Sequence, residues 1–221
     1  MSLIVKICGL KTPETLDVAL DAGADMVGFV FFPPSPRSVT MGEARALGAQ
    51  VKGRAKKVAL TVDADDALLA DIVAALSPDL LQLHGHESPE RVAAIKARFN
   101  LPAMKAIAIE TKADLDLVGT YASVADRILF DARAPKDATR PGGLGKSFDW
   151  HLLENLELKL PFMLSGGLTP ENVAEALRIT RAPGVDVSSG VERAPGEKDA
   201  GKIRDFIRAA RAAATTMMSN V

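Results

Sequence analysis

The feature that most constrains the fold of this chain is a regular alternation of short apolar runs with segments of helical periodicity. The apolar runs have the length of buried strands and are bounded by turn residues. We predict strands at Leu3–Cys8, Met26–Phe31, Lys57–Val62, Leu80–His84, Ala103–Ile107, Ile128–Asp131, Phe162–Leu164 and Val185–Ser188. The segments that follow these runs predict helices at Thr12–Ala22, Thr40–Val51, Ala64–Leu76, Ser88–Phe99, Ala113–Ala122, about Phe148–Asn155, Thr169–Arg178 and Asp199–Ala214.

Strand-helix units repeated in this way predict a parallel sheet covered by helices. Eight such units indicate a closed (β/α)8 TIM barrel, and a length of 221 residues lies at the compact end of that fold. A doubly wound open sheet is the main alternative. No shift in composition marks a domain boundary, so we expect a single α/β domain over residues 1–221.

Three of the predicted helices begin with the same combination of residues. Thr12-Pro13-Glu14, Ser88-Pro89-Glu90 and Thr169-Pro170-Glu171 each place a hydroxyl before a proline and an acidic side chain. A hydroxyl at the N-cap accepts a hydrogen bond from a free amide, and proline suits the first helical position. The acidic side chain interacts favourably with the helix dipole. We therefore predict helix starts at all three places.

The longest irregular stretch, ARAPKDATRPGGLGKS at residues 132–147, follows the sixth predicted strand. A loop of this length after a barrel strand is typical of an active-site lid rather than of a linker. Its GGLGKS segment is similar to part of a nucleotide-binding P-loop. Arg140 occupies the place of the first glycine, however, and the stretch does not follow its strand tightly, so we reject that interpretation. Lys146 is a possible ligand contact.

Composition narrows the classes of function. Hydrophobic residues make up 48% of the chain, charged residues 25%, and the net charge is −1 without a basic stripe, which argues against nucleic acid as a partner. No apolar run approaches the roughly 18 residues of a membrane span. We see no signal peptide and expect a cytoplasmic protein whose lone cysteine is reduced. The three histidines lack metal-ligand spacing, so we expect no metal and no cofactor.

The barrel interpretation predicts which side chains meet inside it. Because side chains alternate along a strand, Lys6 and Cys8 share the inward face, opposite Val5 and Ile7. Active sites of such barrels lie at the carboxyl ends of the strands. The polar side chains expected to converge there are Cys8, His84, Asp131, Asp186 and Ser188.

Cys8 is the only cysteine, and it ends the first predicted strand. A lone cysteine is often a small buried apolar residue, but this position also suits a nucleophile or a general base. Lys6 or Lys105 could increase the thiolate fraction. Asp131 ends the sixth strand, where it either caps a loop or acts as an acid whose pKa is raised by burial.

Two loops predict a phosphate site. LSGGLTPEN follows the seventh strand, and its glycines allow the backbone close to a ligand, whereas VDVSSGVE follows the eighth strand. Barrel enzymes commonly bind phosphate with these two loops and with amides at a helix start. The residues that we expect to contribute are Gly166, Gly167, Ser188, Ser189 and Gly190.

Arg37 lies between prolines and serines in FFPPSPRSVT, after the second strand. A guanidinium held on a stiff loop suits a carboxylate or a phosphate. His84 in LQLHGHE is either a substrate contact or a histidine satisfied by neighbouring polar groups, and His86 is expected on the loop surface.

The motifs KICGLK, GFVFFPPSPRSV, LQLHG, LFDA with GGLGKSFDW, LSGGLTPENV and GVDVSSGVE occur in this order along nearly the whole chain. Together they resemble the phosphoribosylanthranilate isomerase family of tryptophan biosynthesis. The resemblance implies an Amadori rearrangement of N-(5-phosphoribosyl)anthranilate to 1-(2-carboxyphenylamino)-1-deoxyribulose 5-phosphate. It implies that Asp131 is the general acid, Cys8 the general base and Arg37 the residue facing the anthranilate carboxylate. The two glycine- and serine-containing loops would hold the phosphate, and Asp186 would touch substrate or neutralise the inward lysines.

Other functions remain open at this point. One is a different phosphate-binding barrel isomerase or synthase, such as a metal-dependent pentose phosphate epimerase. Another is a catalytically silent sensor of a phosphorylated small molecule. The sequence leaves both monomer and homodimer open.

Overall fold

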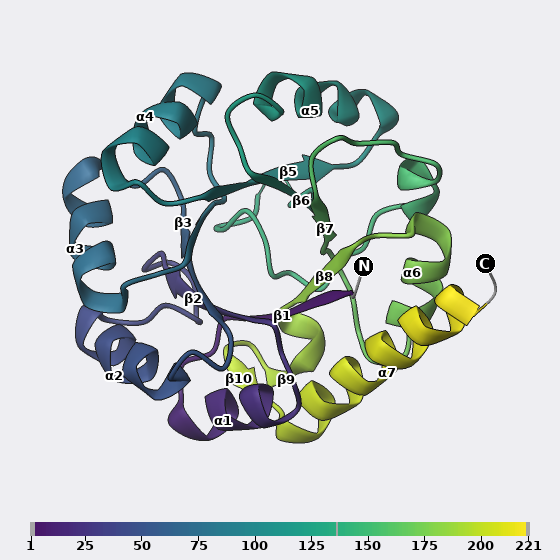
Figure 1. Cartoon of the computed structure of the whole chain (residues 1–221), viewed down its shortest axis with the longest axis horizontal. Helices are drawn as coiled ribbons and strands as arrows, with labels where there is room; N and C mark the ends of the chain where they lie inside the picture. The colour runs from purple at the N-terminus through teal and green to yellow at the C-terminus, as the bar shows by residue number, and fades with distance from the viewer. Residues whose placement is uncertain (1–2, 136, 220–221) are drawn as a thin grey trace.

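The computed structural model describes residues 3–135 and 137–219. Its parallel strands β1 to β8 pair in chain order and close into a barrel, with the helices arranged around it (Figure 1). Closure is made by β8 against β1, where Lys6 is opposite Asp186. The predicted barrel is therefore confirmed, and the open sheet is wrong. The strands are β1 Ile4–Cys8, β2 Met26–Phe31, β3 Lys56–Thr61, β4 Leu80–Leu83, β5 Ala103–Ile109, β6 Arg127–Ala132, β7 Phe162–Leu164 and β8 Gly184–Val187.

The elements around the barrel follow most of the predicted ranges. The α-helices are α1 Pro13–Asp21, α2 Met41–Val51, α3 Asp66–Leu76, α4 Pro89–Phe99, α5 Asp116–Tyr121, α6 Val173–Thr180 and α7 Ala200–Ser219. Short 3-10 helices are η1 Lys112–Leu115, η2 Trp150–Leu153 and η3 Ser189–Val191. Within the described part of the chain, no helix is both long enough and apolar enough to cross a membrane.

Two of the three predicted helix starts are confirmed. The hydroxyls of Thr12 and Ser88 accept hydrogen bonds from the third residue of α1 and α4, respectively. At the third, the hydroxyl of Thr169 accepts a hydrogen bond from the amide of Glu171, but the predicted helix start is wrong because α6 begins only at Val173. The Asn172 side chain accepts a hydrogen bond from the amide of Thr169 and donates one to the carbonyl of Gly167. These bonds favour a turn before α6 and hold the loop after β7 in place.

Two further segments differ from the predictions. The helix expected at about Phe148–Asn155 is only the single turn η2, because the extended backbone of Glu154 ends it and Asn155 follows with a left-handed φ of 59°. After β8 the chain makes η3 and then a short antiparallel hairpin of β9 Glu192–Ala194 and β10 Glu197–Lys198. This hairpin was not predicted, because its strands are too short to show a periodic pattern.

The barrel interior is filled in layers. The outward-facing Val5 and Ile7 pack in the core between sheet and helices, as alternation predicts. Inside, an apolar layer closes the amino-terminal end of the barrel. It consists of Met26, Val58, Leu80, Met104, Leu129 and Met163. Above this layer lies the buried Lys6–Asp186 ion pair, so polar chemistry is confined to the carboxyl end of the strands.

Leu129 in the apolar layer inside the barrel is fully buried. Truncating this side chain would leave a cavity, because the closed ring of strands cannot relax to fill the space. We expect Leu129→Ala to lower the free energy of unfolding by about 2–5 kcal/mol, measured by urea denaturation. Leu117→Ala is the control, because that side chain is 46% exposed; it should change stability by less than about 0.5 kcal/mol. Equal effects of the two variants would contradict the interior layer.

Candidate active site

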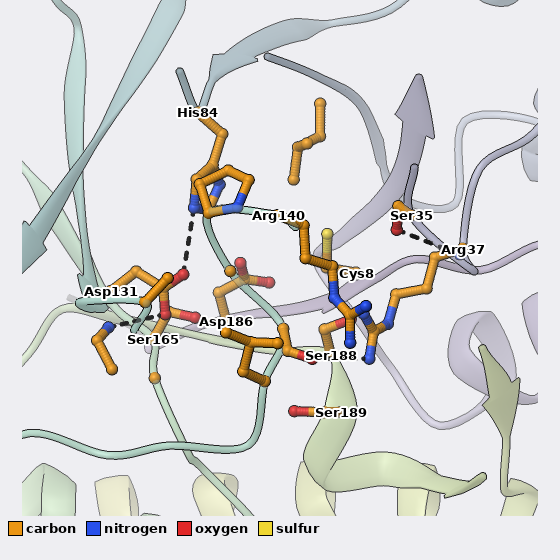
Figure 2. A pocket seen from close by; sticks show the side chains of 18 of the residues that line it. Cys8, Ser35, Arg37, His84, Asp131, Arg140, Ser165, Asp186, Ser188 and Ser189 are labelled. Atoms are coloured by element: carbon orange, nitrogen blue, oxygen red, sulfur yellow. Dashed lines mark hydrogen bonds and ion pairs between the residues drawn. The ribbon is translucent and has the colours of Figure 1, made fainter. Parts of the chain in front are cut away.

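A cavity opens at the carboxyl end of the strands, and it brings together residues from all parts of the chain (Figure 2). It confirms the predicted convergence of Cys8, His84, Asp131, Asp186 and Ser188. Every predicted site residue except Gly190 lines it. The predicted residues found in the lining are Cys8, Arg37, His84, Asp131, Gly166, Gly167, Asp186, Ser188 and Ser189.

Gly190 lies outside the lining, in the turn η3. A Cβ at this position would collide with the carbonyl oxygen of Leu168 in the loop after β7. Gly190 thus allows the loops after β7 and β8 to pack closely, which positions Ser189 at the cavity. Gly190 therefore has a packing role, and its predicted contact with a phosphate stays a prediction.

The thiol of Cys8 sits at the end of β1, beside the buried ion pair between Lys6 Nζ and Asp186 Oδ1, which are 2.9 Å apart. Burial raises the pKa of the Cys8 thiol, although the ammonium groups of Lys6 and Lys198 act in the opposite direction. Burial alone would lower the pKa of Lys6, but Asp186 and Cys8 raise it above its usual value. The predicted effect of a neighbouring lysine on the thiol is therefore present, but burial outweighs it.

Lys105 does not approach Cys8, contrary to one of the predicted possibilities. Its ammonium donates to Glu87 Oε2 at 2.8 Å and to the carbonyl of Gly85 at 2.6 Å. Glu87 also accepts hydrogen bonds from the amides of Asp63 and Gly85. This buried cluster secures the loop after β4, and it keeps a second buried lysine away from the thiol.

Asp131 ends the inward face of β6 and is held from two sides. Its Oδ1 accepts a hydrogen bond from the amide of Ala132, and its Oδ2 lies 3.2 Å from Nε2 of His84, as the dashed line in Figure 2 marks. Nδ1 of His84 faces the side-chain nitrogen of Gln82 at 3.0 Å. With this amide orientation Nε2 carries the hydrogen and donates to Asp131. His84 therefore orients the carboxyl group and also lines the cavity, while His86 is exposed as predicted.

Arg37 belongs to a buried network that the sequence analysis missed. Its Nε and Nη2 donate to the two carboxylate oxygens of Glu192, each at 2.7 Å. Lys198 Nζ donates to Glu192 Oε1 and to the carbonyl of Ser188, each at 2.8 Å. Glu192 and Lys198 come from the unpredicted hairpin. The acid of the GVE motif was a weak signal for Glu192, and no motif pointed to Lys198. The network holds one edge of the Arg37 guanidinium and one end of the loop after β8.

Two cations share one anion in this network, which explains its electrostatics. Burial lowers the pKa of Lys198 to about 8, despite the opposing effect of the Glu192 carboxylate. Burial would raise the pKa of Glu192, but the hydrogen bonds from Arg37 and the charge of Lys198 lower it. This wall of the cavity consequently has a surplus of positive charge, which suits an anionic ligand.

The loop between β6 and η2 lies over the cavity. A Cβ on Gly142 would lie 2.6 Å from Asp131 Oδ2, and a Cβ on Gly143 would lie 2.5 Å from Arg37 Nη1. The carbonyl of Gly143 also accepts a hydrogen bond from Arg37 Nη2 at 3.1 Å. The paired glycines thus let the backbone contact the site directly. Lys146 lines the cavity from the same loop.

The described residues include no cluster of side chains suited to hold a metal ion. No group of three or more histidine, cysteine, aspartate or glutamate side chains is placed among them to hold an ion. The ion pairs around the cavity instead join acidic groups to lysine and arginine. The expected absence of a metal and of a cofactor stays a prediction.

Relatives identify the family. A model of the family described as N-(5'phosphoribosyl)anthranilate (PRA) isomerase matches residues 5–209. The chain belongs to this family. The N-(5'-phosphoribosyl)anthranilate isomerase of Bradyrhizobium sp. strain ORS 278 is 72% identical over 213 residues, which cover 96% of this chain and 97% of the relative.

Solved structures of phosphoribosyl anthranilate isomerases share the barrel. The enzyme from Thermotoga maritima superposes with a TM-score of 0.86 at 34% identity, covering 95% of this chain and 99% of that chain. A second isomerase structure, in complex with reduced 1-(o-carboxyphenylamino)-1-deoxyribulose 5-phosphate, gives a TM-score of 0.83 at 32% identity with the same coverage. For the Thermotoga maritima isomerase, which is described as dimeric, monomers have also been generated.

Lys198 provides a test of the buried network in this family member. Its folded pKa of about 8 lies below its ordinary value of 10.5, so between these values the unfolded chain binds more protons than the folded chain. The contribution of Lys198 to the free energy of unfolding should therefore increase as the pH rises across this window. This contribution is lost as the pH falls through about 8. The slope should approach about 1.4 kcal/mol per pH unit.

The measurement compares urea unfolding of the wild type and Lys198→Met at several pH values within that window. As the pH rises, the free energy of unfolding of the wild type should increase relative to that of Lys198→Met. Parallel curves for the two proteins would contradict the buried state of this ammonium group.

Proposed function

We propose that this chain catalyses the Amadori rearrangement of N-(5'-phosphoribosyl)anthranilate to 1-(2-carboxyphenylamino)-1-deoxyribulose 5-phosphate, a step of tryptophan biosynthesis. Its family membership and the names of its relatives support this reaction. The observation that carries the assignment of residues is the placement of Cys8 and Asp131 in one cavity with two loops suited to phosphate. Both groups are buried, at 3% and 6% exposure, yet both line the cavity.

The substrate phosphate is assigned to the loops after β7 and β8. Gly166 and Gly167 line the cavity from one loop, and Ser188 and Ser189 line it from the other. Backbone amides and hydroxyls in such loops donate hydrogen bonds to phosphate oxygens without requiring a cation. Lys198 supports this assignment, because it holds both the carbonyl and the hydroxyl of Ser188.

The first chemical step opens the sugar ring. Asp131, in its protonated form, donates its proton to the furanose oxygen while the bond from that oxygen to C1 breaks. The lone pair of the anthranilate nitrogen forms the C1–N double bond of a cationic imine. His84 positions the carboxyl group for this transfer, because its Nε2 contacts Oδ2 while the carboxyl group still lines the cavity.

The second step removes the proton from C2. Cys8, as the thiolate, accepts this proton, and the electrons of the C–H bond form the C1–C2 double bond and neutralise the imine. The enolamine then tautomerises to the ketone. Since the cationic imine makes C2 acidic, a thiolate is a strong enough base for this step. Lys6 and Lys198 favour this thiolate, and Asp186 neutralises Lys6 in the way that the sequence analysis considered.

We further propose that the loop at residues 132–147 acts as a lid over the bound sugar. Its glycines lie against Asp131 and Arg37, so an extended substrate could enter only after the loop moves. The expected setting is the cytoplasm, with a phosphorylated small molecule as ligand and with neither nucleic acid nor membrane as partner.

Turnover separates this function from the alternatives. The fluorescence of freshly prepared phosphoribosylanthranilate is followed with and without the protein. A silent sensor would bind the compound without accelerating its loss, and a metal-dependent epimerase would lose activity with a chelator. Rapid, chelator-resistant loss of fluorescence is the outcome expected here.

Cys8→Ser should reduce kcat by at least about 100-fold, because a serine hydroxyl is a far weaker base near neutral pH. The variant should retain the melting temperature of the wild type and its affinity for reduced 1-(o-carboxyphenylamino)-1-deoxyribulose 5-phosphate. A kcat equal to that of the wild type would exclude Cys8 as the base.

Asp131→Asn should also reduce kcat by at least about 100-fold, because an amide cannot supply the proton for ring opening. The shape of the side chain and its hydrogen bond from Ala132 are preserved. Asp137→Asn, at an exposed position of the same loop, serves as the control and should leave kcat unchanged. Undiminished turnover of Asp131→Asn would refute the acid role.

A further inference from the structure

Arg140 is a cavity residue to which neither the sequence analysis nor the proposed mechanism assigns a role. It lies on the loop between β6 and η2, and its side chain extends into the same cavity as that of Arg37 (Figure 2). Its Nε is buried without a hydrogen-bond partner. Among the described residues, Arg140 forms no hydrogen bond and no ion pair, whereas Arg37 is anchored by Glu192.

A guanidinium in this state is well suited to bind an anion. A buried donor without a partner is unfavourable, and more so when the group is charged. The nearby wall adds to the cost, because Glu192 is already shared by Arg37 and Lys198. Gly143, three residues after Arg140, lies directly against Arg37 Nη1, so the loop brings the second cation to this end of the cavity. A negatively charged ligand group would satisfy both arginines.

The substrate carries two anionic groups, and one of them already has a site. The loops after β7 and β8 supply amides and hydroxyls for the phosphate, around Gly166, Gly167 and Ser189. Arg37 is anchored through Nε and Nη2, and its Nη1 forms no hydrogen bond to the described residues. A planar carboxylate can accept hydrogen bonds from two guanidinium groups at once. The geometry therefore favours the aryl carboxylate as the group that meets Arg140.

We propose that Arg140 binds the aryl carboxylate of the substrate together with Arg37, and thereby makes the enzyme selective for an amine component that carries this carboxylate. The inference rests on the proposed function, which supplies the carboxylate. It also gives the loop a role in recognition, because the second guanidinium reaches the ligand only when the loop lies over the cavity.

The test compares the binding of two ligands by the wild type and by variants of Arg140. One ligand is reduced 1-(o-carboxyphenylamino)-1-deoxyribulose 5-phosphate, and the other has an unsubstituted phenyl ring in place of the carboxyphenyl group. Dissociation constants are measured by calorimetry for the wild type, Arg140→Gln and Arg140→Lys. Arg45→Gln is the matched control, since this arginine is exposed on α2 outside the cavity.

Arg140→Gln should weaken binding of the carboxylated ligand by roughly 10- to 100-fold and change binding of the phenyl ligand by less than about 2-fold. Arg140→Lys should lie between the wild type and Arg140→Gln, because it keeps the charge without the planar fork. Arg45→Gln should bind both ligands like the wild type. Melting temperatures of the variants should match, since Arg140 contributes no hydrogen bond to the described fold.

Two results would overturn the inference while leaving the proposed function intact. If Arg140→Gln weakens the binding of both ligands equally, Arg140 contacts the phosphate instead. If the variant and the wild type bind with equal affinity, Arg140 does not contribute to substrate binding. Failure of the wild type to turn over phosphoribosylanthranilate would instead overturn the proposed function itself.

Discussion

Closure of the sheet between β8 and β1 is the constraint on which the rest of the structure depends. This pairing sets Lys6 opposite Asp186, although the two residues are 180 positions apart in the sequence. It forms a ring in which each inward side chain faces others from distant strands. The apolar layer fills the amino-terminal half of that ring, so the polar groups are left at the carboxyl end, where Cys8 and Asp131 share a cavity.

Charge is arranged around this cavity so that cations exceed anions on one wall. Arg37 and Lys198 share Glu192, whereas Lys6 has Asp186. In the proposed function an anionic substrate neutralises this surplus. The same positive charge favours the Cys8 thiolate against the effect of burial. We therefore expect substrate binding and activation of the proposed base to depend on the same charged groups.

Local patterns predicted much of the fold and most of the site. The strand ends at Cys8 and Asp131 could be located because strand periodicity and barrel topology together define which side chains face inward. The helix start predicted at Thr169 was placed too early, because Asn172 forms hydrogen bonds within the loop before α6. Glu192 and Lys198 were missed since the hairpin that carries them is too short to leave a pattern in the sequence.

Residue patterns alone were enough to give the number and order of the barrel strands, their inward faces and the family that the motifs resemble. These are properties of periodicity and residue type, which act over a few neighbouring positions. Only the tertiary structure decided that Glu192 anchors Arg37, that Lys105 is held away from Cys8, and that Arg140 extends into the cavity without a partner. The physical reason is that burial and pairing of charges depend on groups from distant segments, which meet only after the barrel has closed.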